Sequence, residues 1–574
     1  MAILLATLAY ESFANSIEPE LVVARVRYET LDDIHKLADY DVWEFNNLAE
    51  KYVLVALDRD QIPAVEALGF QVSVDLAKTA VFASNRHPFF GGYRTVPELY
   101  ADMAALADAH PQLAQIVTYG ESHCLTQAGC TTPNGDSWNG VPLQAIRITN
   151  SDTPGSSVIT NGTITGSTKP VFFLTAATHP REITTPELAM RLADWLLTSY
   201  GVDANTTWLV DWHELWIVPV VNPDGHWVVQ LGTEPPYNGF PFFQRKNLND
   251  DTNNDGNLDC SIWPPSPNAQ YGVDLNRNHS FAWGPPGSSN SRCSAIYRGS
   301  HAASEVEIAQ LESLIRTLIP DQRGPALTDP APPDTKGLFI SLHSFSRLVL
   351  WPWGYTTAPA PNKDGLKAIG DKLATYNGYT SCQPSLCLYG VNGASDDWVY
   401  GELGVPAFTF EVGQIFMPSY QSIDSTQWPD NKPAFLYAAS IAAAPYQLVH
   451  GPDVLDITTA VSPHSNSLTL SATLDDSANG NLPIASAIYT IDAPPWAEGV
   501  EALPIEPDDG SFDAPVEEGT AVIDTTSLSL GQHTLYMQAQ DSAGNWGPVS
   551  AIYFTVEEAP PPYRTLFFPF VSAP

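Results

Sequence analysis

Apolar and polar positions alternate differently in successive parts of the chain, beginning with a short α/β pattern in residues 21–77. Four runs with two-residue alternation or β-branched residues predict strands, namely "LVVARVRY", "DVWEFNNL", "KYVLVALD" and "FQVSVD". Two amphipathic stretches predict helices, "TLDDIHKLADY" and "RDQIPAVEALG". The order strand, helix, strand, strand, helix, strand predicts a small ferredoxin-like α/β domain.

The next region, residues 91–449, alternates buried strand-like runs with longer amphipathic helices such as "TVPELYADMAALADAH" and "SEVEIAQLESLIRTL". This alternation predicts an α/β domain with a parallel or mixed sheet. From 451 to 557 the pattern changes to short alternating strands separated by turn residues, as in "SLTLSATL", "ASAIYTID" and "GTAVIDTT". The second pattern predicts an immunoglobulin-like β-sandwich.

Three segments fall outside these domains. Residues 1–20 contain an apolar stretch without a basic region before it, which is an incomplete signal peptide or leader. Residues 78–90 form a polar, Gly-containing connector, and residues 558–574 form a Pro-rich tail for which we have no mechanism. No apolar run approaches the roughly 20 residues that a membrane span needs, so we expect no such span.

Charge and cysteine content narrow the class of protein. Twenty-six Lys and Arg stand against 64 Asp and Glu, a net charge of -38 that argues against nucleic-acid or anionic-lipid partners. Acidity alone could equally be an adaptation for solubility.

The even number of cysteines and their local spacing favour disulfides and secretion over six unrelated thiols. The expected pairs are Cys124 with Cys130, Cys382 with Cys387, and Cys260 with Cys293.

Candidate metal ligands follow an apolar run in "VFFLTAATHPREITTPE", where His179 and Glu182 precede a helical pattern. The common HExxH helix is absent, because Ile217 stands where "WHELWIV" would need its second His. A catalytic zinc needs a third protein ligand and an open position. His343, at the end of the apolar strand "GLFISLHSFS", is the candidate. Taken alone, a His in this position is more often structural.

A series of ordered motifs changes this interpretation. After the opening motif come "VPVVNPDG", "FFQRKN", "YGVDLNRNHSFAWG", "CSAIYRGSHAASEVE", "LHSFSRLVLWPWGY" and "LYGVNGASDDWVYGELGVPAFTFEVG". The series resembles the zinc metallocarboxypeptidases of the carboxypeptidase A and B family over residues 90–445. The resemblance implies a carboxypeptidase-like mixed sheet flanked by helices, and hydrolysis of the C-terminal bond of peptides and proteins.

The resemblance also implies roles for individual residues. It makes His179, Glu182 and His343 the zinc ligands and Asp274 the carboxylate that orients a ligand His. It gives catalytic roles to Glu411, as general base, and to Arg245, which would stabilise the oxyanion. It implies substrate contacts for Arg181, Asn276, Arg277 and Tyr389, the middle two binding the terminal carboxylate. Cys260 and Cys293 bracket the same segment as a disulfide of the family.

Side-chain preference is expected to depend on Asp396 in "GASDDWVY". By the resemblance, this position is acidic in carboxypeptidase B-like enzymes and apolar in carboxypeptidase A-like ones. An acid there predicts a preference for C-terminal Arg or Lys. Ala394 departs from the Gly that is frequent in the animal enzymes, which leaves mixed specificity open.

Further predictions concern calcium and the flanking domains. Asp251, Asn253, Asp255 and Asp259 in "DDTNNDGNLD" have EF-hand-like spacing, but Ile262 replaces the closing Glu, so a simple calcium loop and a solvated acidic turn are both open. By the resemblance, the N-terminal domain is expected to be a propeptide removed by cleavage near Arg86, with a permanent accessory domain as the alternative. A peptidase for peptidoglycan stem peptides and an inactive binding module are the competing functions. The partner of the β-sandwich is unknown.

Overall fold

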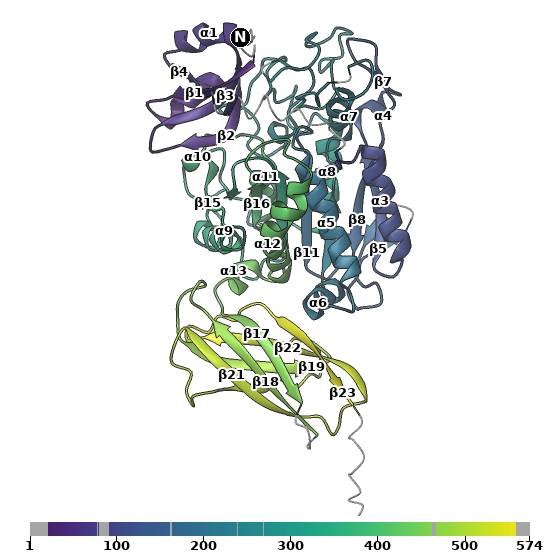
Figure 1. Cartoon of the computed structure of the whole chain (residues 1–574), viewed down its shortest axis with the longest axis vertical. Helices are drawn as coiled ribbons and strands as arrows, with labels where there is room; N and C mark the ends of the chain where they lie inside the picture. The colour runs from purple at the N-terminus through teal and green to yellow at the C-terminus, as the bar shows by residue number, and fades with distance from the viewer. Residues whose placement is uncertain are drawn as a thin grey trace, which may run out of the picture.

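The structure is a computed structural model, and it describes residues 21–557 except 77, 80–90, 161–162, 238, 268 and 462–465. The predicted leader, the C-terminal tail and Arg86 lie outside the described residues. Figure 1 shows three bodies arranged along the longest axis: a small α/β body, a large α/β body and an all-β body. No helix of the described residues is long and apolar enough to cross a bilayer.

The first body contains an antiparallel sheet in the order β2-β3-β1-β4. All four strands that the apolar pattern predicts are present, while the first predicted helix is a 3-10 helix with Thr30 at its N-terminus. The elements are β1 (Leu21–Arg27), η1 (Leu31–Leu37), β2 (Asp41–Asn47), β3 (Tyr52–Asp58), η2 (Arg59–Gln61), α1 (Ile62–Ala67) and β4 (Gln71–Val74).

The central body is built on an eight-stranded mixed sheet in the order β15-β14-β16-β13-β11-β12-β8-β5. Strands β16, β13, β11 and β12 are mutually parallel and wholly buried, as expected for the centre of an α/β sheet. The strands are β5 (Ala114–Glu121), β8 (Pro142–Ile148), β11 (Val171–Thr175), β12 (Glu214–Val218), β13 (Leu338–His343), β14 (Leu348–Leu350), β15 (Thr380–Cys382) and β16 (Ala407–Glu411). This sheet confirms the prediction of an α/β domain with a mixed sheet flanked by helices.

Helices cover this sheet, and four of them contact one another in the order α3, α5, α12, α9 to form one layer. The helices are α3 (Val96–Ala109), α4 (His123–Thr126), α5 (Thr184–Thr198), α6 (Ala204–Trp212), α7 (Pro223–Leu231), η3 (Leu275–Arg277), α8 (Val306–Leu318), α9 (Lys363–Asn377), α10 (Pro384–Cys387), α11 (Ser395–Leu403), η4 (Ile423–Gln427), α12 (Trp428–Ser440) and α13 (Pro445–Leu448). Two short ladders, β6 (Cys130–Thr131) with β7 (Ser137–Trp138) and β9 (Val158–Thr160) with β10 (Thr163–Thr165), lie in the loops.

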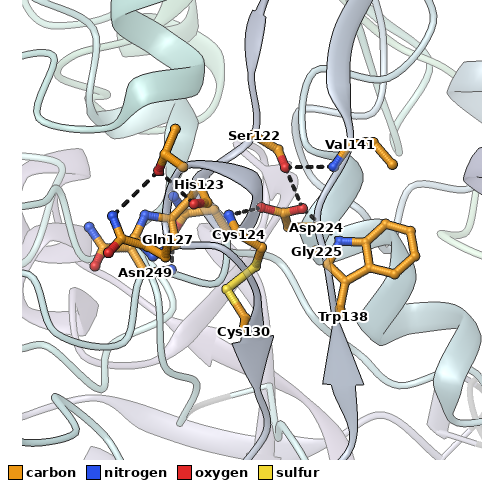
Figure 2. The surroundings of a disulfide bond; sticks show 12 residues. Ser122, His123, Cys124, Gln127, Cys130, Trp138, Val141, Asp224, Gly225 and Asn249 are labelled. Atoms are coloured by element: carbon orange, nitrogen blue, oxygen red, sulfur yellow. Dashed lines mark hydrogen bonds between the residues drawn. A yellow bond between two sulfur atoms is a disulfide. The ribbon is translucent and has the colours of Figure 1, made fainter.

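All three expected disulfides are present: Cys124–Cys130, Cys260–Cys293 and Cys382–Cys387. Figure 2 shows the first of them beside the buried carboxylate of Asp224. That carboxylate accepts hydrogen bonds from the Cys124 amide at 2.8 Å, the Ser122 hydroxyl at 2.8 Å and the Trp138 indole at 2.7 Å. Hydrogen bonds therefore connect the disulfide loop to the first turn of α7.

The third body contains seven antiparallel strands in the order β17-β18-β21-β20-β19-β22-β23 around its own apolar core. They are β17 (Asp453–Val461), β18 (Ser467–Asp475), β19 (Ile484–Ile491), β20 (Leu503–Pro507), β21 (Val516–Asp524), β22 (Gly531–Asp541) and β23 (Ser550–Val556). This body packs against the end of the central body, where the Ala551 amide donates to Asn205 at 2.8 Å and the Tyr553 hydroxyl to Thr207 at 2.7 Å.

Candidate metal centre and substrate cleft

Three side chains converge at one edge of the central sheet. His179 and Glu182 lie in the turn between β11 and α5, and His343 is the last residue of β13, the parallel neighbour of β11. The Nδ1 atom of His179 lies 2.8 Å from Glu182 Oε1, and the Nδ1 atom of His343 lies 3.1 Å from Glu182 Oε2. Because parallel strands end at the same edge, residues 164 positions apart meet there.

The donor set fits a zinc ion. The two Nδ1 atoms lie 3.1 Å apart and are both directed at the same carboxylate, a separation at which two N–H groups would repel each other. The other ring nitrogens have their own partners: His179 Nε2 lies 3.1 Å from Asp274 Oδ1 and His343 Nε2 lies 3.1 Å from Ser341 Oγ. These outer contacts favour the tautomers that leave both Nδ1 lone pairs for a metal.

No other group of three among the described His, Cys, Asp and Glu residues brings its ligand atoms within 4.8 Å of one another. All three members of the group are 1% exposed or less. Two imidazoles and a carboxylate are a ligand set that zinc accepts while keeping a position open. These residues could therefore hold one zinc ion.

Asp274 connects this group to two arginines. Its Oδ2 atom accepts a hydrogen bond from Arg245 Nε at 2.9 Å and lies 4.0 Å from Arg277 Nη1. Burial alone would raise the pKa of Asp274, but Arg245, Arg277 and His179 lower it well below its usual range. The residue is therefore ionised, and it orients both a metal-directed imidazole and a cleft arginine.

A cavity opens beside the three converging residues. Its lining contains the expected zinc ligand His179, the expected catalytic residues Arg245 and Glu411, and four of the expected substrate residues, Asn276, Arg277, Tyr389 and Asp396. Asn276 is held by the Ser395 amide, which donates to its Oδ1 at 3.0 Å, and Arg277 donates from Nε to the Gly287 carbonyl at 2.9 Å. The structure thus gathers residues from separate segments of the chain around one cavity.

Asp396 is 3% exposed and lies in the first turn of α11, next to Asp397. Asp397 accepts hydrogen bonds from the amides of Gly354 and Tyr355, at 2.8 and 2.9 Å, and so stabilises the neighbouring loop. Burial raises the pKa of Asp396, and the residue lines the cavity.

Arg181 is the one expected substrate residue that does not line this cavity. Its two terminal nitrogens donate to the two carboxylate oxygens of Asp41 on β2, both at 2.9 Å. Tyr389 also meets the first body, since its hydroxyl donates to the Val42 carbonyl at 3.5 Å. Strand β2 therefore contacts two of the expected substrate residues, Arg181 and Tyr389.

Sequence reasoning missed Ser341 and Asp41. Ser341 precedes His343 by two residues on the same strand, and two-residue spacing places both side chains on one face of the sheet, a usable signal. No local pattern marks Asp41.

The structure gives the predicted calcium loop no support. Asp251 accepts hydrogen bonds from the amides of Asp255 and Gly256, and Asp255 accepts from the amide of Asn257. Asp259 forms an ion pair with Arg292, and Asn253 donates to Asp255. The polar side chains of this loop form hydrogen bonds and an ion pair with nearby groups. This arrangement agrees with the alternative prediction, a solvated acidic turn.

Comparisons with known proteins agree with this geometry. Residues 131–432, slightly more than half of the chain, match the family model described as zinc carboxypeptidase. Carboxypeptidase A1 of Mus musculus is 26% identical over 331 residues, covering 56% of this chain and 63% of its own length. Zinc carboxypeptidase A 1 of Anopheles gambiae is 27% identical over 399 residues, covering 67% of this chain and 72% of its own. The chain thus spans less than two thirds of the mouse relative.

Solved structures show the same fold. Carboxypeptidase A of Helicoverpa armigera superimposes with a TM-score of 0.52 and 20% identity, covering 75% of this chain and 98% of that one. Thrombin activatable fibrinolysis inhibitor superimposes with a TM-score of 0.51 and 19% identity, covering 74% of this chain and 99% of that one. Together with the family match, the converging His179, Glu182 and His343 show that the chain belongs to the zinc carboxypeptidase family.

Proposed function

We propose that the protein is a secreted zinc carboxypeptidase that removes C-terminal Arg and Lys from peptides and proteins. The observation that carries the basic preference is the buried carboxylate of Asp396 in the cavity that also contains Arg277 and Glu411. A guanidinium or ammonium group entering this cavity would gain a charge-assisted hydrogen bond in a setting of low dielectric constant. Secretion is supported by the three disulfides.

Substrate binding would use the arginine clamp. Arg277, with Asn276 beside it, offers a planar fork that matches a terminal carboxylate. This clamp would favour chain ends over internal bonds, since an internal peptide bond has no carboxylate to offer. Tyr389 would close over the bound residue after its contact with Val42 is released.

Hydrolysis would require a base and an oxyanion donor. Zinc held by His179, Glu182 and His343 would supply Lewis-acid polarisation and make water more acidic. Glu411 would take the proton from the attacking water and return it to the leaving amine. Arg245, held by Asp274, would stabilise the negative charge that develops on the scissile carbonyl oxygen.

The first body would serve as a ferredoxin-like pro-domain. Its strand β2 contributes Asp41 to the ion pair with Arg181, and the Asn46 side chain donates to the Leu388 carbonyl at 2.6 Å. Trp43 packs edge-on against Phe345 and Phe416, with 5.5 Å between ring centroids in each pair. These contacts would exclude substrate until the connector at 78–90 is cleaved. The third body would be an accessory immunoglobulin-like domain.

One assay tests the proposal. Peptides that differ only in a C-terminal Arg, Lys, Leu, Phe or Glu are incubated with the chain before and after proteolysis of the connector, with and without a zinc chelator. We expect chelator-sensitive release of Arg and Lys that increases after proteolysis. Chelator-insensitive hydrolysis, or internal cleavage of the peptides, would contradict the mechanism. Release from peptidoglycan stem peptides alone would favour the competing function.

A further inference from the structure

One wall of the substrate cavity is formed by residues 383–391, which follow the edge strand β15 and which we call the wall segment. The disulfide Cys382–Cys387 joins the last residue of β15 to the last residue of the one-turn helix α10. The wall segment is thus closed into a small covalent loop shortly before Tyr389. Four of its residues line the cavity, namely Pro384, Leu388, Tyr389 and Val391.

The anchor of this loop belongs to a row of residues that crosses three strands of the sheet. Cys382 on β15 pairs with Leu350 on β14, and Leu350 pairs with Thr409 on β16. Leu350 and Thr409 both line the cavity, and the Thr409 side chain forms a hydrogen bond with the carboxyl group of Asp396. The disulfide therefore connects the wall segment, through this row, with the residue proposed to select basic side chains.

The far end of the wall segment is held through Gly354. Its carbonyl accepts a hydrogen bond from the Val391 amide at 3.0 Å, and its amide donates to Asp397 at 2.8 Å. Between the two ends, the Leu388 carbonyl and the Tyr389 hydroxyl contact the first body, so release of that body would end both contacts. The disulfide would then be the covalent constraint nearest to Tyr389.

This disulfide also differs from the other two in its accessibility. Both of its cysteines are partly exposed. Each of the other bonds has one buried cysteine, Cys124 at 0% and Cys260 at 2% exposure. Because exposed disulfides are reduced more readily than buried ones, a reductant should open Cys382–Cys387 first.

We propose that the Cys382–Cys387 disulfide is a specificity determinant, which holds the wall segment close to Asp396 and so excludes water from the cavity. This role rests on the proposed carboxypeptidase function and deepens it. Opening the bond would release the wall segment from β15, and water beside Asp396 would weaken its attraction for a basic side chain. A Phe side chain has no charge interaction to lose. Cys382 and Cys387 are thus positioning residues.

The test uses the full chain with zinc bound, after its connector has been cleaved, and compares wild type with Cys382→Ser/Cys387→Ser. Values of kcat and KM are measured for peptides that differ only in a C-terminal Arg or Phe. We expect the Arg-to-Phe ratio of kcat/KM to fall about tenfold in the variant, through a higher KM for the Arg peptide. The value of kcat should stay within about threefold, because the proposed base and the metal-directed residues lie on other segments.

Cys124→Ser/Cys130→Ser is the matched control. Its cysteines are six positions apart against five for Cys382 and Cys387, and its loop lies beside Asp224. Within the described residues, no member of that loop lines the cavity, so this variant should keep the wild-type ratio.

A second arm needs no variant protein. Wild type is treated with a phosphine reductant under native conditions, and alkylation followed by mass spectrometry identifies the enzyme in which only Cys382 and Cys387 are reduced. Its Arg-to-Phe ratio should fall as in the variant, and this arm decides if the variant does not fold.

An unchanged Arg-to-Phe ratio after loss of the Cys382–Cys387 bond would overturn the inference alone, as would an equal fall in the control variant. A wild type that hydrolyses no peptide, or that shows no preference for Arg, would overturn the proposed function and the inference with it.

Discussion

His343 and Glu411 are paired residues at the ends of the parallel strands β13 and β16. The backbone register of the sheet therefore sets the relation between a metal-directed imidazole and the proposed base. Both residues are nearly inaccessible to solvent, at 1% and 4% exposure. Substitutions that keep the shape of these buried side chains are therefore needed to separate their chemistry from effects on the sheet.

Glu411→Gln should remove hydrolysis while leaving the metal site intact. The substitution keeps the shape of the side chain and removes its ability to accept a proton, so kcat should fall by about 10²- to 10⁴-fold with little change in KM. Zinc content, measured by mass spectrometry of the metal, should be unchanged. Glu402→Gln is the control, since Glu402 pairs with Arg316 at the surface and should retain full activity. Loss of zinc from Glu411→Gln would contradict the assignment of Glu411 as base rather than ligand.

Asp274→Asn should weaken zinc binding. Asp274 accepts from His179 Nε2 and Arg245 Nε, so an amide in its place would disturb both the imidazole and the arginine. We expect zinc affinity to fall about 10- to 100-fold, measured by competition with a chromogenic chelator. Asp321→Asn, at an exposed position in the loop after α8, is a suitable control. An unchanged zinc affinity would mean that the sheet alone orients His179.

The preference for basic termini should increase with pH. Because burial raises the pKa of Asp396, the carboxyl group stays protonated at pH values where an exposed Asp is already ionised. The ratio of kcat/KM for Arg-ended over Phe-ended peptides should therefore rise as pH increases through this raised pKa. Asp396→Asn should lose both the preference and its pH dependence. If Asp396→Ala left the Arg-to-Phe ratio unchanged, Asp396 would have no part in specificity.

Asp41→Asn should loosen the first body from the cleft. Removing one partner of a buried ion pair leaves an uncompensated charge, which typically costs about 3 to 5 kcal/mol. We expect the intact chain of this variant to hydrolyse Arg-ended peptides faster than the intact wild type, before any proteolysis. Asp32→Asn is the control, because its side chain is 96% exposed. Equal latency of Asp41→Asn and wild type would contradict the role of the Asp41–Arg181 pair.

Stability should decrease from mildly acidic to mildly alkaline pH because of Glu307. Burial, with Asp224 and Glu305 nearby, raises the pKa of Glu307 to about 8. A carboxyl group with a raised pKa in the folded state stabilises fully below its unfolded value of about 4.3, and this contribution is lost as pH rises through about 8. Its Oε1 atom accepts from the amide of His123, next to the disulfide loop of Figure 2.

Thermal melting between pH 5 and pH 9 checks this prediction. The melting temperature of wild type should fall across the interval by more than that of Glu307→Gln, whose side chain cannot ionise. Glu498→Gln, at an exposed position of the third body, should follow wild type. Parallel curves for wild type and Glu307→Gln would show that Glu307 does not titrate in this range.

The features predicted from sequence are those with a local signal. Apolar periodicity indicated β11 and β13, and the alternation of strands and helices indicated that they are parallel. Parallel strands end at the same edge of a sheet. His179, Glu182 and His343 are therefore expected to converge there. The motif series indicated the cleft residues. Local cysteine spacing indicated two disulfides, and all three formed.

The features that sequence did not predict depend on contacts between separate bodies. Asp41 is 140 positions from Arg181, and its pairing depends on how the first body docks.

The EF-hand-like spacing of Asp251 and Asp255 was misleading, because the same residues also cap tight turns. Their side chains satisfy backbone amides of the loop.

The turn "HPRE" places Arg181 between two residues that face the metal position. If zinc and the first body both order this turn, the two binding events would be thermodynamically linked. Whatever factor zinc adds to the affinity of the cleft for the first body, the first body adds to the affinity for zinc. Release of the first body would then leave an enzyme that exchanges its metal more readily than its latent form does, and the latent form would be the better store of zinc.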